Sequence, residues 1–140
     1  MTPGNRPNSA GRRPRCAAII LLLIPVGLLC RFVPLGLPYI IVKYGGSFLW
    51  AATVYWCIAF MGAQSRPEVI ALTAAVATTL VEFVKLIQSP GLGTFRNTFA
   101  GKVLLGRHFS YIDIAVYCCA ILSSLLIDKR AIHFQSASKE

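Results

Sequence analysis

Residues 68–88, EVIALTAAVATTLVEFVKLIQ, decide the fold of this protein. The stretch is apolar almost throughout, and its only charged residues are Glu68, Glu82 and Lys85. At a rise of 1.5 Å per residue, a helix over this stretch is ~30 Å long, which matches the hydrocarbon core of a bilayer. Pro67 precedes it at a position that the first turn of a helix tolerates. The stretch therefore predicts a transmembrane helix.

Three other apolar runs of similar length lie at residues 16–32, 46–62 and 110–128. Hydrophobic residues make up 56% of the 140-residue chain and charged residues only 14%, whereas soluble domains carry roughly 25% charged residues. The composition therefore excludes an ordinary soluble domain. We predict one all-α domain, an integral membrane four-helix bundle with spans at about 16–32, 46–62, 68–88 and 110–128.

The two ends of the chain differ from these runs. Residues 1–15 are basic and rich in Pro and Gly, which predicts a disordered N-terminal tail. Residues 129–140 predict a cytoplasmic C-terminal tail. No small-residue cleavage site follows the first apolar run, so we expect an uncleaved membrane helix and not a signal peptide.

The net charge of +9 reflects membrane topology and not a surface for nucleic acid, because the basic residues gather at the chain ends and between the apolar runs. Four spans put eight of them on the side of the termini: Arg6, Arg12, Arg13, Arg15, Arg66, Lys129, Arg130 and Lys139. Five lie on the other side: Arg31, Lys43, Arg96, Lys102 and Arg107. The positive-inside rule then predicts a multi-pass membrane protein with both termini in the cytoplasm.

Residues 89–109 predict an interfacial element between the third and fourth spans. Leu92, Phe95, Phe99, Val103 and Gly106 recur at spacings of three and four, which is typical of an amphipathic helix. Such a segment lies at the depth of the lipid headgroups. The alternative is an extended loop, because glycines stand at positions 91, 93 and 101.

Polar residues of all four spans converge on the side away from the termini. Ionisable groups at membrane depth cost ~2.5–3.5 kcal/mol each on insertion scales and usually face one another. Cations outnumber acids in this layer, and a cation surplus suits an anionic lipid or a lipid-linked glycan. The candidate ligand-binding residues are Arg31, Lys43, Glu82, Lys85, Arg96 and Asp113.

Other interpretations remain open for these residues. The Lys and Arg side chains can simply reach the headgroup layer, or Glu82 can lock the helices through one buried ion pair. Glu82 and Asp113 can act as acid and base in a hydrolase or transferase, but no nucleophile is visible in the sequence. No metal or cofactor signature appears, and five cysteines without a C-x-x-C spacing predict packing roles. A transporter would require a homo-oligomer, because four short helices leave little room for a pore.

Several stretches resemble a known family. KYGGSFLWA (43–51), VEFVKL (81–86) and TFRNTFAGKVLLGRHFSYIDIAVY (94–117) are similar to the small bacterial membrane proteins called domain of unknown function 2809. The order of Glu82, Arg96 and Asp113 also resembles VanZ-like proteins, which implies a role at the cell envelope. The resemblance implies a location in a bacterial cytoplasmic membrane. It also implies glutamine where this chain has Lys85 and an acid where it has Ser47, so one base gained and one acid lost raise the net charge of the layer by two units.

Together these observations predict an uncharacterised membrane protein that binds an anionic envelope lipid or lipid-linked glycan, or modulates its processing. The first alternative is a structural or assembly protein whose charges fix helix packing. The second is a membrane enzyme that uses Glu82 and Asp113. The sequence favours the two roles without catalysis.

Overall fold

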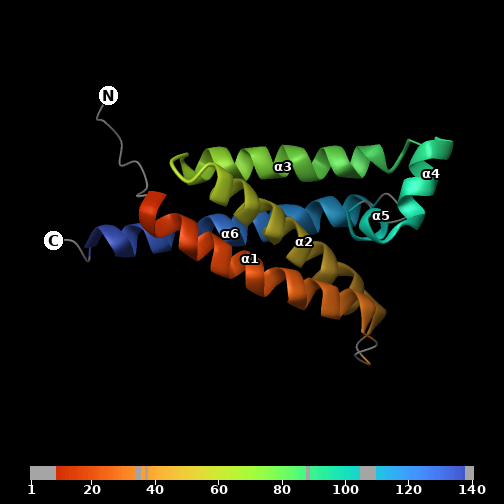
Figure 1. The fold of residues 1–140 in the computed structure, drawn as a ribbon, viewed down its shortest axis with the longest axis horizontal. Coiled ribbons are helices and arrows are strands. Elements are labelled where there is room, and N and C mark those ends of the chain that lie inside the picture. The colour runs from red at the N-terminus through yellow and green to blue at the C-terminus, as the bar shows by residue number, and fades with distance from the viewer. Residues whose placement is uncertain (1–8, 34–35, 37, 88, 105–109, 138–140) are drawn as a thin grey trace.

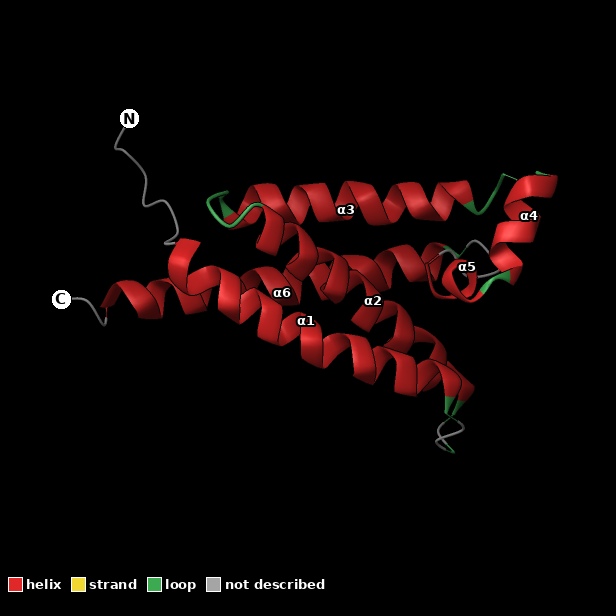
Figure 2. Cartoon of the chain, viewed as in Figure 1, coloured by secondary structure: helices red, strands yellow, loops and turns green. Residues whose placement is uncertain are grey.

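The computed structural model describes residues 9–33, 36, 38–87, 89–104 and 110–137. These residues form helices joined by short connections, and no strand occurs among them (Figure 2). Four helices are long: α1 (Ser9–Phe32), α2 (Tyr39–Met61), α3 (Pro67–Val84) and α6 (Tyr111–Ala137). Two are short: α4 (Pro90–Asn97) and α5 (Phe99–Leu104).

Helix α2 occupies the centre of the structure, because it packs against α1, α3 and α6 (Figure 1). The first residues of α1 and the last residues of α6 lie at one end of the molecule, here called the terminal end. Helices α4 and α5 lie at the opposite end, here called the α4–α5 end (Figure 1). The termini therefore share one end, as four antiparallel helices require.

Small side chains allow this close packing. Ala51, Ala59, Ala74 and Ala120 are fully buried where the long helices meet. Small residues let helix backbones approach closely. The resulting van der Waals contacts are among the forces that hold helices together in lipid.

Helix α3 shows how the sequence divides between an inner and an outer face. Its buried residues recur every four positions and end with an acid: Ile70, Ala74, Thr78 and Glu82. Its large apolar residues point outward and are more than half exposed: Val69, Leu72, Val76, Leu80 and Phe83. A continuous apolar surface of this kind is unusual for a soluble monomer and suits contact with lipid.

Among the described residues, three helices are long and apolar enough to cross a membrane: Ala10–Cys30, Pro67–Val84 and Tyr111–Phe134. The predicted span at 46–62 lies in α2, which is not one of the three. The all-helical prediction is confirmed, whereas the fourth membrane span is not.

The described parts of the two predicted tails are helical. Residues 9–15 belong to α1, although their composition predicted disorder, because Arg12 makes tertiary hydrogen bonds in this first part of the helix. Residues 129–137 continue α6 past the predicted end of the fourth span. Residues 1–8 and 138–140 lie outside the described residues.

The amphipathic segment forms two helices and not one. Thr98 has an extended backbone (φ −72°, ψ 160°), and it separates α4 from α5. Its side chain accepts a hydrogen bond from the Gly101 N–H (3.1 Å), as an N-cap residue does. The Phe99 ring stacks on the Phe32 ring with centroids 5.2 Å apart, so α5 lies against the end of α1. Val103 and Gly106 of the predicted stripe lie outside the described side chains.

The close packing of the buried face of α3 can be tested by a change in stability. We expect Ala74→Leu to lower the free energy of unfolding by about 1–3 kcal/mol, because Ala74 is fully buried and the larger side chain overpacks the contact. Val76→Leu is the matched control, since Val76 is 52% exposed. Unfolding in detergent, monitored by circular dichroism, measures both. Equal stability of the two variants would contradict close packing of this face.

Candidate functional site

A buried carboxylate organises the α4–α5 end. Glu82 is fully buried near the end of α3 and forms an ion pair with Lys85, three residues later. The Tyr117 hydroxyl donates to Glu82 Oε1 (2.6 Å), and the Ser110 N–H lies 3.4 Å from Glu82 Oε2. We call these four residues the Glu82 cluster: Glu82, Lys85, Ser110 and Tyr117.

The local sequence explains why these groups meet. Glu82 continues the buried face of α3, and Lys85 lies on the same side because residues three apart are neighbours on a helix. Tyr117 comes from α6, and its ring centroid lies 5.4 Å from that of Trp50 on α2. The cluster therefore joins α3 to α6 and contacts α2 through Trp50. Its three donors offset the cost of burying the carboxylate.

The second acid of this layer has a different partner. Asp113 is 5% exposed, and its Oδ1 accepts a hydrogen bond from the Ser47 hydroxyl (3.2 Å) on α2. Ser47 and Lys85 are the two positions at which the family resemblance showed a departure. Each of them contacts an acid in the structure, so both departures alter the polar layer directly.

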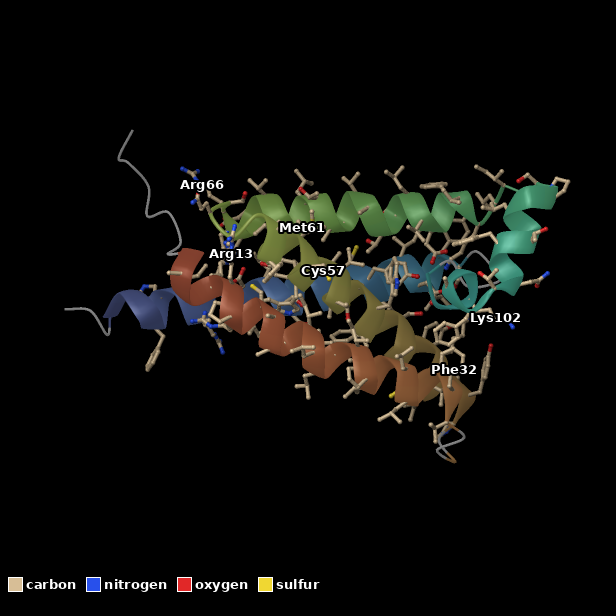
Figure 3. The ribbon with its side chains drawn as sticks, viewed as in Figure 1. Arg13, Phe32, Cys57, Met61, Arg66 and Lys102 are labelled. Carbon is tan, nitrogen blue, oxygen red and sulfur yellow. The ribbon has the colours of Figure 1, made fainter. Side chains whose placement is uncertain are left out.

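Of the other predicted site residues, the structure describes the side chain of Lys43 and only the backbone of Arg31 and Arg96. Lys43 is partly exposed on α2, with its Nζ 5.2 Å from the centre of the Tyr44 ring. Arg31 lies in the last turn of α1 and Arg96 in α4, so both belong to the α4–α5 end by their backbone. Their side chains lie outside the described residues. Figure 3 shows Phe32 and Lys102 at this same end and Arg13 and Arg66 at the terminal end.

A second buried ion pair lies at the terminal end. Arg12 of α1 pairs with Asp128 of α6, and both side chains are almost completely buried. Arg12 Nη1 also donates to the carbonyls of Ala63 (3.1 Å) and Ser65 (2.7 Å), between α2 and α3. The Tyr55 hydroxyl donates to Asp128 Oδ2 (2.9 Å). We call Arg12, Tyr55 and Asp128 the Arg12 cluster.

Sequence reasoning missed this second cluster. Arg12 fell in the predicted disordered tail, and Asp128 stood at the predicted end of a span. The sequence did contain a signal for this pair. Arg12 precedes the first apolar run and Asp128 ends the fourth, so both lie on the side of the termini. Arg12 Nε and Asp128 Oδ1 are buried and form no hydrogen bond within the part of the chain that the structure describes.

Residues 36–121 match a family that is described as protein of unknown function (DUF2809). The chain belongs to the DUF2809 family. The match contains the whole Glu82 cluster, together with Ser47 and Asp113, whereas Arg12 and Asp128 lie outside it. No solved structure matches this chain.

The contacts limit what chemistry this DUF2809 protein can perform at Glu82. Oε1 accepts from Lys85 and Tyr117, whereas the only contact of Oε2 within the described residues is the Ser110 N–H at 3.4 Å. The described residues include no group of three His, Cys, Asp or Glu side chains able to hold a metal ion. All five cysteines are free thiols. The described contacts of Glu82 join α3 to α6.

The Tyr117 hydroxyl contributes to the stability of the Glu82 cluster. We expect Tyr117→Phe to lower the free energy of unfolding by about 1–3 kcal/mol, because a buried carboxylate oxygen loses a donor. Tyr39→Phe is the control: its side chain is 76% exposed, and surface changes usually stay within about 0.5 kcal/mol. Thermal unfolding in detergent distinguishes the two, and similar melting temperatures would contradict a structural role for this hydrogen bond.

A substitution in the Arg12 cluster is expected to lower the free energy of unfolding by more than Tyr117→Phe does. Asp128→Asn leaves the Arg12 guanidinium buried without its carboxylate, which costs ~3–5 kcal/mol. The matched control is Glu68→Gln, because the exposed Glu68–Lys129 pair (2.7 Å) contributes only about 0–1 kcal/mol. Both variants lose one acid and are compared by denaturant unfolding in detergent. A loss of the same size in both would show that burial of the pair is unimportant.

Proposed function

We propose that this DUF2809 protein is a multi-pass membrane protein that binds an anionic envelope lipid or lipid-linked glycan at its α4–α5 end, or modulates the processing of that ligand. The observation that carries the proposal is that both acids at this end already form an ion pair or hydrogen bonds with neighbouring protein groups. Glu82 is occupied by Lys85, Tyr117 and Ser110, and Asp113 accepts from Ser47.

The charge balance supports an anionic ligand. The segments 31–44 and 82–113 contain six basic residues and two acids. Glu82 forms its ion pair with Lys85, and Asp113 accepts a hydrogen bond from the Ser47 hydroxyl. Two acids cannot neutralise six basic residues, so this end keeps an excess of positive charge. Basic clusters beside apolar helices attract anionic lipids, by ~1 kcal/mol per basic residue near the surface.

The arrangement in the membrane is part of the same proposal. Helices α1, α2, α3 and α6 span a bacterial cytoplasmic membrane, and both termini lie in the cytoplasm. The terminal end carries Arg13, Arg66 and Lys129 on its exposed surface, in agreement with the positive-inside rule. The α4–α5 end then faces the opposite side of the membrane, with Arg31, Lys43 and Arg96 as the proposed anion contacts. Lys85, predicted as a further contact, is buried and paired with Glu82.

A substitution in α4 tests ligand binding. We expect Arg96→Gln to remove a discrete anionic molecule that co-purifies with the unmodified protein, while the helical fold is kept. Lys129→Gln is the matched control, because Lys129 is an exposed cation at the terminal end. Native mass spectrometry of gently solubilised protein measures bound ligand. Absence of any bound mass in the unmodified protein, or equal retention by both variants, would contradict the proposal.

A structural or assembly role is the second candidate, and the complete burial of Glu82 favours it. In that case the charges at both ends serve only to align the helices. Glu82→Gln separates the two roles. A structural protein loses stability without releasing any defined ligand, whereas a binding protein that stays folded loses the ligand.

A further inference from the structure

Helices α1 and α2 enclose an apolar groove at the surface of the protein. Ile24, Gly27 and Leu28 line it from α1, and Leu49, Trp50 and Thr53 line it from α2. Its volume is about 80 Å³, which fits a short length of hydrocarbon and not a whole ligand. The Thr53 hydroxyl donates to the Leu49 carbonyl of its own helix (2.8 Å), so it does not require a partner in the groove.

The groove opens toward the lipid-facing surface of α1. Ile24 lines it and is 44% exposed, and the neighbouring Leu21 and Leu22 are more exposed still. An apolar site that faces the bilayer is filled by lipid hydrocarbon, because water gains no hydrogen bonds there. Hydrocarbon is therefore the natural occupant.

Lys43 lies on the same face of α2 as the residues that line this groove. Lys43, Gly46, Trp50 and Thr53 follow one another at spacings of three, four and three, so they share one face of the helix. Gly46 stands between the groove and Lys43, and a Cβ atom built on it meets nothing within 4 Å. The open face thus continues from Trp50 toward Lys43, about 10 Å along the helix axis.

Helix α1 has the same pattern on its side of the groove. Ile24, Gly27 or Leu28, and Arg31 lie on one face by their spacing, and Arg31 occupies the last turn of the helix. The Lys43 ammonium lies over the Tyr44 ring, 5.2 Å from its centre, and keeps its positive charge in this contact. An apolar groove that ends at cations is complementary to an acyl chain attached to a phosphate.

We propose that the α1–α2 groove holds an acyl chain of an anionic glycerophospholipid whose phosphate contacts Lys43. This inference rests on the proposed function and names the ligand class and the path that it takes. Trp50 lines the groove, and its ring lies 5.4 Å from Tyr117, which donates to Glu82. The bound chain therefore contacts the residue that connects α2 to the Glu82 cluster.

Fluorescence quenching by brominated acyl chains tests this site, since Trp50 lines the groove whereas Trp56 is 2% exposed and provides a background. The intact protein is reconstituted in phosphatidylcholine vesicles that contain increasing fractions of brominated phosphatidylglycerol or brominated phosphatidylcholine. We expect phosphatidylglycerol to quench at a roughly fivefold lower fraction, the preference that one basic residue near the surface provides. Equal quenching by both lipids would overturn the proposal.

Three variants locate the site. Lys43→Gln should remove the preference for phosphatidylglycerol and leave quenching by phosphatidylcholine unchanged. Gly46→Leu should weaken quenching by both lipids, because its side chain fills the open face. Gly45→Leu is the matched control, since a Cβ there also meets nothing within 4 Å but lies on a different face. Identical quenching curves for the two glycine variants, or an undiminished preference in Lys43→Gln, would overturn the groove assignment.

Circular dichroism confirms that each variant is folded, and Lys43→Gln tests the site even where Gly46→Leu disturbs the helix. The outcomes also separate this inference from the proposed function. Release of a co-purifying anionic ligand by Arg96→Gln, with unchanged quenching in Lys43→Gln and Gly46→Leu, refutes only the groove. An unmodified protein without a bound anionic ligand and without lipid preference refutes both.

Discussion

Glu82 is a carboxylate buried between helices whose outer surfaces are apolar, and the α4–α5 end depends on how its charge is satisfied. Its donors come from α3, from the residue that precedes α6, and from α6 itself. Because a buried charge that loses one partner is strongly destabilising, these contacts restrict how α3 and α6 pack. Tyr117 extends the restriction to α2 through its contact with Trp50.

The same physical constraint operates at the terminal end with different helices. Arg12 joins the start of α1 to Asp128 of α6 and to carbonyls of the α2–α3 connection. The central helix contributes Tyr55 to this end and Ser47 and Trp50 to the other. Arg12 and Asp128 lie outside the range that matches the DUF2809 family, whereas the Glu82 cluster lies inside it. The two buried pairs therefore lie at opposite ends of the molecule and share no residue.

The α4–α5 end combines features that favour a lipid ligand. Its acids are engaged by protein groups and its basic residues are in excess, and we propose that the apolar groove between α1 and α2 continues toward Lys43. Lipid headgroups supply negative charge and acyl chains supply hydrocarbon, so one molecule matches both features.

The sequence by itself determined the helical class and the apolar helices predicted at about 68–88 and 110–128, which the structure places at Pro67–Val84 and Tyr111–Ala137. These features follow from local composition and from the spacing of residues on one helix. Only the tertiary structure decided that residues 9–15 are helical, that Thr98 divides the amphipathic segment, and that Asp128 receives Arg12 and Tyr55. Partners in these contacts come from helices far apart in the chain, and periodicity within one segment carries no information about them.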